Sequence, residues 1–189
     1  LIKSNDLFVI LRNTILYNLV FIVLGMVVSV GLAIMISLMR NKRASKVYQT
    51  MMFFPYFMSW VVASYFLDAF LNQNNGLINN MLRNSGQQPI QWYMTAGAWP
   101  AILTFMYLWK STGYNMVIYL SSISGIDTTL YEAAVMDGAN KRQQVFHITL
   151  PCLKNVIIMM FILNVGKIFY SDFGLFYQLS QGASGSIFK

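Results

Sequence analysis

One uninterrupted apolar run limits what this chain can fold into more than any other feature. Residues 13–39, NTILYNLVFIVLGMVVSVGLAIMISLM, contain no charged side chain between Arg12 and Arg40. A helix needs roughly 20 apolar residues to cross the hydrocarbon layer of a bilayer, and this run exceeds that length. The sequence therefore predicts a membrane-spanning helix at about 14–39.

Small residues recur at every fourth position of this run, at Gly25, Ser29, Ala33 and Ser37. Residues four apart lie on one face of a helix, and small side chains let a second helix approach closely in lipid. We therefore expect this stripe to pack against another helix of the chain.

Three further apolar stretches predict spans at about 47–70, 98–123 and 152–170. Pro55 lies in the first third of span 47–70, where it is expected to kink the helix or to begin its regular part. Loop 72–93 is rich in Asn and Gln, with a short helix expected at its GLINNML stretch, and the chain after 170 is polar and glycine-rich. The predicted fold is all-α, a polytopic membrane helix bundle forming one transmembrane domain over 1–189.

Composition supports this class and excludes several others. The chain is 57% hydrophobic and 10% charged, whereas soluble domains are about a quarter charged. The net charge of +7 is grouped in short loops between apolar runs, which is typical of membrane topology and not of a nucleic-acid surface. Cys152 is the single cysteine, which excludes an intrachain disulfide and a cysteine metal cage, and no metal site is expected.

The positions of the cations predict the orientation. Cytoplasmic loops of membrane proteins carry an excess of Lys and Arg. With four spans, the more basic side holds loop 40–46 and segment 127–151, which are therefore predicted to be cytoplasmic, and loop 72–93 is predicted to be extracytoplasmic. The basic side carries Arg40, Lys42, Arg43, Lys46, Lys141, Arg142 and Lys154, and the other side carries Lys3, Arg12, Arg83 and Lys189.

Segment 127–151 is polar and interrupted by turn residues. Thr129 and Glu132 have the spacing of a capping box that begins a helix near 130, and Gly138 can end that helix in a left-handed conformation. Asn140 can cap a second short helix over 141–148, and Pro151 suits the first turn of the next span. The pattern alone leaves two hypotheses open: a helix that docks on a partner, or an amphipathic helix on the lipid interface.

The same residues resemble the EAA loop of permease subunits in binding-protein-dependent ABC importers. The chain matches the loop motif at every fixed position: EAA is followed by three residues, a Gly, nine residues and I-x-L-P. Asp137 lies on the same helix face as the two alanines. Flanking stretches such as RNTILYNLVF, FFPYFMSWVV and GKIFYSDFGLFYQL are similar to the carbohydrate-uptake branch, near permeases for complex oligosaccharides. The resemblance marks these residues as coupling to an ATPase: Glu132, Ala133, Ala134, Asp137, Gly138, Ile148, Leu150 and Pro151.

This resemblance implies a MetI-like permease core in the plasma membrane of a bacterium. It implies an oligosaccharide substrate, a second homologous permease subunit, a cytoplasmic ABC ATPase dimer that binds ATP and Mg, and an extracytoplasmic solute-binding protein. Members of this family have a further helix before and after these four spans. We therefore expect the sequence to be a piece of a longer protein.

No enzyme site is predicted on this chain. It lacks the G-x-x-x-x-G-K-[ST] phosphate loop, and its six carboxylates are scattered. Lys110 lies near the middle of its span, so it is expected either to line the translocation path or to pair with a buried acceptor. Further candidates for the path are Tyr114, Asn115, Asn164, Lys167 and Tyr170, although isolated polar residues also tie helices together and Lys167 can reach the membrane surface.

Other functions are compatible with parts of this pattern. A stand-alone secondary carrier would need a coupling-ion site, for which intramembrane carboxylates are favoured, and Asp68 near a helix end is the nearest candidate. A permease for a different small solute would share all of these features. A non-transporting membrane scaffold would give Lys110 no role.

Overall fold

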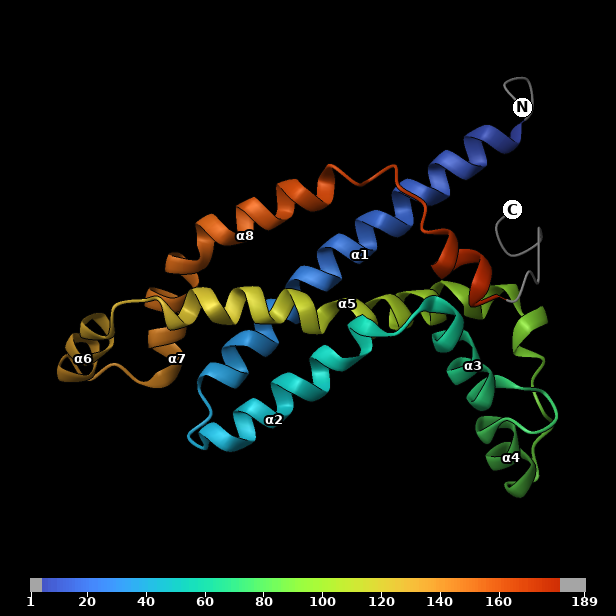
Figure 1. The fold of residues 1–189 in the computed structure, drawn as a ribbon, viewed down its shortest axis with the longest axis horizontal. Coiled ribbons are helices and arrows are strands. Elements are labelled where there is room, and N and C mark those ends of the chain that lie inside the picture. The colour runs from blue at the N-terminus through green and yellow to red at the C-terminus, as the bar shows by residue number, and fades with distance from the viewer. Residues whose placement is uncertain (1–4, 181–189) are drawn as a thin grey trace. The chain divides into compact units, whose positions relative to one another are not determined.

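A computed structural model describes residues 5–180. Helices and their connecting loops make up this part of the chain, with no strand within it, which confirms the predicted all-α class (Figure 1). The helices belong to two compact units. One comprises the described residues up to Leu19, Phe57–Tyr107 and the described residues from Ile168 onward, and the other comprises Val20–Tyr56 and Leu108–Lys167. We call them the first and the second unit.

Helix α1 spans Asn5–Ser37 and covers the predicted first span except for its last two residues. Within the second unit, Ser29 and Ala33 of its small-residue stripe are fully buried. The Ser29 hydroxyl donates a hydrogen bond to the Thr112 carbonyl of α5, at 3.4 Å. The prediction that this stripe packs against another helix is therefore confirmed, and its partner is α5.

Helix α2 spans Lys42–Phe53 and begins earlier than the sequence predicted. The Asn41 side chain caps it by accepting hydrogen bonds from the backbone N–H groups of Arg43 and Ala44, at 3.0 and 3.2 Å. Because this cap begins the helix at Lys42, the cations of the predicted loop 40–46 lie mostly on the first turns of α2.

The predicted span 47–70 is interrupted in the structure near Pro55, and its two parts together still have the length and apolar character of one broken span. Helix α2 runs into a 3₁₀ segment, η1, at Phe54–Phe57, which contains the buried Pro55. Helix α3 begins anew at Trp60 and ends at Leu71, with the Ser59 side chain accepting from the Val62 N–H. The proline removes one backbone donor and the serine provides a new cap, so the helix ends and restarts instead of only bending.

Loop 72–93 contains helix α4, Leu77–Asn84, at the predicted place. Its buried Asn79 fixes the loop on both sides. The side-chain amide donates to the carbonyls of Asn72, Gln73 and Ile90, at 3.3, 3.4 and 2.9 Å, and its oxygen accepts from the Ile90 N–H. The Arg83 guanidinium adds hydrogen bonds to the Gln73 and Asn74 carbonyls. This polar loop is therefore held in one conformation by its own side chains.

After two 3₁₀ turns, η2 (Trp92–Met94) and η3 (Ala96–Ala98), helix α5 spans Trp99–Ser124. It agrees with the predicted span 98–123. Helices α6 (Thr128–Met136) and α7 (Lys141–Gln144) follow, and a π-helical turn, η4 (Val145–Thr149), joins α7 directly to α8 (Leu150–Val165). Helix α8 ends at Val165 and not near 170 as predicted, and the Lys167 N–H after it donates to the Asn164 carbonyl, three residues back, at 3.0 Å.

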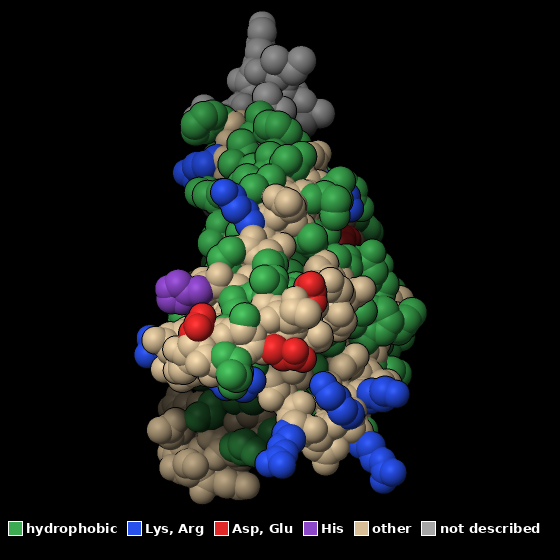
Figure 2. Space-filling model, turned by 90° about the vertical axis from the view of Figure 1, so that its left-hand side faces the viewer, with side chains coloured by type: hydrophobic (Ala, Val, Ile, Leu, Met, Phe, Trp, Pro, Cys, Tyr) green, Lys and Arg blue, Asp and Glu red, His purple; other side chains and the backbone are tan. Residues whose placement is uncertain are grey.

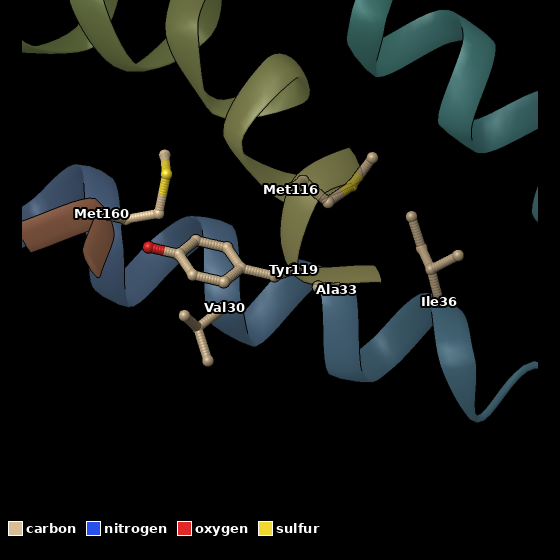
Figure 3. Packing of buried hydrophobic residues seen from close by; sticks show 6 residues of the cluster. All are labelled: Val30, Ala33, Ile36, Met116, Tyr119 and Met160. Carbon is tan, nitrogen blue, oxygen red and sulfur yellow. The ribbon is translucent and has the colours of Figure 1, made fainter. Parts of the chain in front are cut away.

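A hydrophobic cluster holds the second unit together. It combines side chains from three helices, α1, α5 and α8, and Figure 3 shows Tyr119 of α5 lying among residues of the other two helices. Between helices in a bilayer, close van der Waals packing of such side chains is what stabilises the contact, because the surrounding lipid is itself apolar. The cluster consists of Val30, Ala33, Ile36, Met116, Tyr119 and Met160.

In the first unit, the chain after 170 turns back into a helix, where the sequence indicated only a polar end. The Asp172 carboxylate accepts from the Gly174 and Leu175 N–H groups and so begins a π-helical segment, η5, at Gly174–Gln178. Its second oxygen accepts from the Trp60 indole N–H of α3, at 2.9 Å. A side chain at Gly174 would overlap the Trp60 ring, so the two segments are in close contact.

Two helical stretches, Phe8–Ser37 and Lys141–Val165, are each long and apolar enough to cross a membrane. Lys42–Phe57 and Trp60–Leu71 meet the same criterion together, as one interrupted span. The described residues thus give two or three candidate spans by length and composition, fewer than the four predicted. Helix α5 has the length, but its middle is polar, with Lys110, Ser111 and Thr112 in succession.

Candidate functional site

Helix α6 begins at a different cap from the one that the sequence indicated. The Asp127 side chain is the N-cap and accepts from the Thr129 N–H, at 2.9 Å. The predicted cap, Thr129, is therefore wrong by two residues, because Asp is the stronger capping residue of the two. The backbone hydrogen bond from Thr129 lowers the pKa of Asp127 below its ordinary value.

The end of α6 has the geometry expected of a glycine stop. Gly138 has a φ of +78°. Its N–H donates to the Val135 carbonyl at 3.0 Å, and the Ala139 N–H donates to the Ala134 carbonyl at 2.8 Å. This pair of bonds is the Schellman motif, which requires the left-handed conformation that glycine adopts most easily. The predicted left-handed stop at Gly138 is confirmed.

Helix α7 follows at once and is capped as predicted. The Asn140 side chain accepts from the Gln143 N–H at 3.0 Å, and the Gln143 side chain accepts from the Asn140 N–H at 2.8 Å. This reciprocal pair is a capping box. The helical segments α7, η4 and α8 follow one another without a break, so a movement of the capped end of α7 would also move α8.

Two side-chain contacts connect α6 and its turn to the continuous helix. The Tyr131 hydroxyl is 2.9 Å from the Thr149 hydroxyl, in the π-helical turn. The buried Gln144 donates to the Ala139 carbonyl at 3.1 Å. Sequence reasoning did not identify these contacts, since they depend on how the chain folds at the turn between α6 and α7.

The α6 residues predicted to couple to an ATPase are placed on its accessible surface. Glu132, Ala133 and Asp137 are exposed and Ala134 is half-buried. The sequence analysis missed Met136, which is 87% exposed, the most of any large apolar side chain described. A methionine beside a predicted glycine stop was the available signal, because flexible apolar side chains are common at docking surfaces.

The three C-terminal residues of the predicted coupling set lie in the continuous helix. Ile148 is half-buried in the π-helical turn, and Leu150 packs against the hydrophobic cluster of the second unit. Pro151 occupies the first turn of α8, as predicted. The geometry gives Leu150 a packing contact, and a role in coupling stays a prediction for all eight residues.

Charged side chains gather on this side of the second unit. Figure 2, which faces α6 and α7, shows acidic side chains with Lys and Arg around them. Asp127, Glu132 and Asp137 are exposed there, as are Lys141 and Arg142. Met136 belongs to the same helix as Glu132 and directly precedes Asp137, and an apolar side chain with polar groups near it is typical of protein interfaces.

A second cluster lies where η1 meets α5, within the second unit. A side chain at Gly113 would overlap the Met52 carbonyl, so the two backbones are in direct contact. One residue further, the Tyr114 ring stacks on the Tyr56 ring, with centroids 4.6 Å apart and planes 12° apart. The Phe53 ring stacks against both. We call Phe53, Tyr56, Lys110 and Tyr114 the aromatic–lysine cluster.

Lys110 is held in this cluster by Tyr56. Its ammonium group donates to the Tyr56 carbonyl at 2.7 Å and lies over the Tyr56 ring, 5.6 Å from the centroid. The carbonyl oxygens in the last turn of a helix receive no hydrogen bond from a backbone N–H of that helix. Where a membrane helix is broken, these oxygens can therefore accept from a cation. Sequence analysis did not connect Lys110 with Tyr56, since the two are 54 residues apart.

The remaining path candidates are less closely connected. Asn115 is half-buried on α5, and the Asn164 amide donates back to the Met160 carbonyl of its own helix, at 2.7 Å. Lys167 is exposed just after α8, and Tyr170 is exposed in the first unit. The structure therefore brings Lys110 and Tyr114 together, and a role in the path stays a prediction for all six residues.

Comparison with known proteins agrees with the predicted resemblance. The family described as "Binding-protein-dependent transport system inner membrane component" matches residues 25–171. A polygalacturonan/rhamnogalacturonan transport system permease protein, YteP of Bacillus subtilis (strain 168), is 32% identical over 95% of this chain and 56% of that protein. The lactose transport system permease protein LacF of Rhizobium radiobacter is 31% identical over 93% of this chain and 58% of its own length.

Solved structures show the same fold. A bacterial ABC transporter involved in the import of the acidic polysaccharide alginate matches with a TM-score of 0.88 and 28% identity, over 97% of this chain and 66% of that chain. The alginate transporter in complex with an alginate pentasaccharide-bound periplasmic protein matches with a TM-score of 0.87 and 28% identity, over 97% and 65%. The chain spans just over half the length of the curated relatives named above. With a family match over residues 25–171 and the fold of solved importers, this chain belongs to the inner-membrane components of binding-protein-dependent transport systems.

Proposed function

We propose that this chain is part of a membrane-spanning subunit of an ATP-driven importer, with an oligosaccharide as substrate. The observation that carries the proposal is the helix–glycine–helix segment from Asp127 to Pro151, which lies within the family match and has both caps and the left-handed glycine in place. Relatives whose names describe sugar transport permeases support the substrate class.

In this proposal, α6 docks on a cytoplasmic ABC ATPase subunit. Its exposed Met136 and Val135 would enter a groove of the partner, and Glu132 and Asp137 would meet basic groups beside it. ATP and Mg would be bound and used on that partner chain, and this chain would have no enzymatic role. The Tyr131–Thr149 contact and the capping box would then carry movement of α6 into α8.

The proposed setting follows from the cations and the family. The α6–α7 side would face the cytoplasm of a bacterium, and the other half of the translocation path would come from a second homologous permease subunit. Loop 72–93 would face outward, toward an extracytoplasmic solute-binding protein. The hydrogen bonds of Asn79 support this part, because a loop held in one conformation can present a fixed docking surface.

Replacing the exposed Met136 tests the docking surface. Met136→Asp in the full-length subunit should abolish co-purification of the ATPase subunit, because it places a charge in an apolar contact. Met81→Asp is the matched control, since Met81 is a 60% exposed methionine on α4 of the predicted outer loop. Affinity purification from membranes measures both. Full ATPase recovery with Met136→Asp, or loss with both variants, would contradict the proposed docking.

We further propose that the substrate is an acidic oligosaccharide and that Lys110 meets its carboxylate. A lysine near the middle of a membrane helix is costly unless it has a partner or a functional role. Here the Tyr56 carbonyl holds the ammonium group over the Tyr56 ring, on which the Tyr114 ring stacks, and these two side chains are 42% and 40% exposed. Flat aromatic faces suit the C–H surface of a sugar ring, and an ammonium group suits a uronate. Among the relatives, the alginate importer is described as acting on an acidic polysaccharide.

The charge of Lys110 is tested by uptake of charged and neutral oligosaccharides. Lys110→Gln should lower uptake of a uronate oligosaccharide by about tenfold, a loss of ~1.4 kcal/mol, with normal subunit yield and basal ATPase activity. Lys110→Arg should retain part of the uptake, and Lys154→Gln, a change at an exposed lysine of α8, should retain all of it. Poor yield of Lys110→Gln would show a structural role instead, and unchanged uptake would contradict the proposal.

The alternatives predict other results. A secondary carrier would transport without an ATPase partner and would depend on an ion gradient. A permease for a different small solute would couple to the ATPase but would show no response of uronate uptake to Lys110. A scaffold would show no uptake in any variant.

A further inference from the structure

A basic cavity lies in the second unit, apart from the exposed face of α6 and from the aromatic–lysine cluster. Its volume is about 610 Å³. The end of α1, the first turns of α2, the end of α5, the start of α6 and the α7–η4 segment all contribute to its lining. The translocation proposal does not use this cavity, and the coupling proposal uses only two residues of its lining, Tyr131 and Thr149.

Three lysines line the cavity: Lys42 and Lys46 of α2, and Lys141 of α7. No Asp or Glu is among the described residues that line it. Lys141 is held in place, because its ammonium group donates at 3.2 Å to Gln144, a residue that is itself buried. The cavity therefore has a concentrated positive charge without a carboxylate of its own to balance it.

The rest of the lining combines hydrogen-bonding and apolar groups. Ser45 is buried and its hydroxyl oxygen accepts from the Gln49 amide at 3.0 Å. Other hydroxyl groups come from both sides of the cavity, and apolar side chains from α1, α5 and α7–η4 complete it. The hydroxyl residues are Ser37, Ser45, Ser121, Ser124, Thr128, Tyr131 and Thr149.

We propose that this cavity binds the phosphate group of an anionic phosphate ester. Three ammonium groups match the charge and the oxygen acceptors of a phosphate better than those of a single carboxylate. The lysines carry this argument, because the Ser37 and Ser124 hydroxyls already donate to the Ile34 and Leu120 carbonyls. Basic pockets between membrane helices on the cytoplasmic side bind anionic lipid head groups, and the apolar part of the lining suits the carbon portion of such an ester. A phospholipid head group and a soluble phosphate share this chemistry.

The experiment compares two double variants of equal charge change in the full-length transporter with its partner subunits. Lys42→Gln/Lys141→Gln removes two cations of the cavity. Arg43→Gln/Arg142→Gln removes the adjacent cations of the same two helices, which are exposed and do not line it. Each protein is reconstituted with phosphatidylcholine, with or without phosphatidylglycerol. Native mass spectrometry measures the retained lipid, and equilibrium dialysis measures binding of inorganic phosphate.

We expect the lysine double variant to lose about tenfold in bound phosphatidylglycerol or phosphate, with the arginine double variant equal to wild type. Retention of phosphatidylglycerol alone would identify a lipid site, and binding of inorganic phosphate would identify a soluble ligand. Lys42→Arg/Lys141→Arg should restore binding, which separates loss of charge from loss of folding. Equal losses in both double variants would overturn the proposal as general surface charge, and so would the absence of binding to wild type.

Discussion

Gly113→Ala is expected to prevent assembly of the folded protein, although alanine is the better helix former. In an unpacked helix this change would stabilise by about 0.8–1 kcal/mol. At Gly113, however, the new methyl group would overlap the Met52 carbonyl and lie 2.8 Å from the Phe53 nitrogen. Backbone atoms cannot rotate away as a side chain can, so we expect a cost of about 3 kcal/mol or more. Yield of monodisperse protein in detergent and its thermal unfolding measure the effect.

Gly31→Ala is the matched control for that experiment. Gly31 also lies inside a long helix, α1, and an added methyl group there would meet nothing within 4 Å. This variant should retain wild-type yield and should unfold at the same or a slightly higher temperature. Equal yield and unfolding temperature for Gly113→Ala and Gly31→Ala would contradict the close contact between α5 and the end of α2.

Gly138→Val is expected to abolish the proposed ATP-driven uptake while the subunit still inserts into the membrane. The residue has a φ of +78°, and an added Cβ atom would meet no atom within 4 Å. The whole effect therefore comes from the backbone, where a left-handed conformation costs a side-chain-bearing residue roughly 1–2 kcal/mol, and a β-branched residue more. Relief of that strain would break the Schellman bonds and move α6 relative to α7. Substrate-stimulated ATPase activity and uptake in proteoliposomes measure the loss.

Gly138→Asn separates the backbone conformation from other effects of the substitution. Asparagine adopts the left-handed region far more readily than valine, so this variant should retain most of the uptake even though it adds a polar side chain. Equal loss in both variants would show that the absence of a side chain matters and not the conformation. Normal uptake with Gly138→Val would remove the α6–α7 turn from the coupling mechanism.

The sequence predicted best what depends on nearby residues. Helices α1 and α5 were recognised by length and hydropathy, and the buried face of α1 by its small residues. The turn at Gly138 and the cap at Asn140 were also predictable, because capping bonds join residues two to five apart. The error at Thr129 has the same local origin, since Asp127 offered a competing cap two residues earlier.

Features that depend on distant residues were not predictable in this way. Pro55 signalled a kink, but the complete break before Trp60 accompanies a carbonyl held by Lys110 and a backbone contact at Gly113, both on another helix. The η5 segment was missed although its capping bonds from Gly174 and Leu175 to Asp172 are local, and only the contact of Asp172 with Trp60 of α3 depends on a distant residue. In the candidate path, the sequence supplied Lys110 and Tyr114, and only the structure supplied their partners Tyr56 and Phe53.

The π-helical turn at Val145–Thr149 has a consequence for the direction in which α8 faces. Its closing bond joins the Leu150 N–H to the Val145 carbonyl, five residues back, so the turn contains one residue more than an α-helical turn spans. Each residue of an α-helix adds about 100° of rotation, and every side chain after the turn is rotated accordingly. The buried Leu153 and Met160 owe their inward direction to that inserted residue. This π-helical turn therefore determines which side chains of α8 face inward, independently of the tilt of the helix. Deleting or inserting one residue there would rotate α8 about its own axis while leaving its path through the bilayer the same.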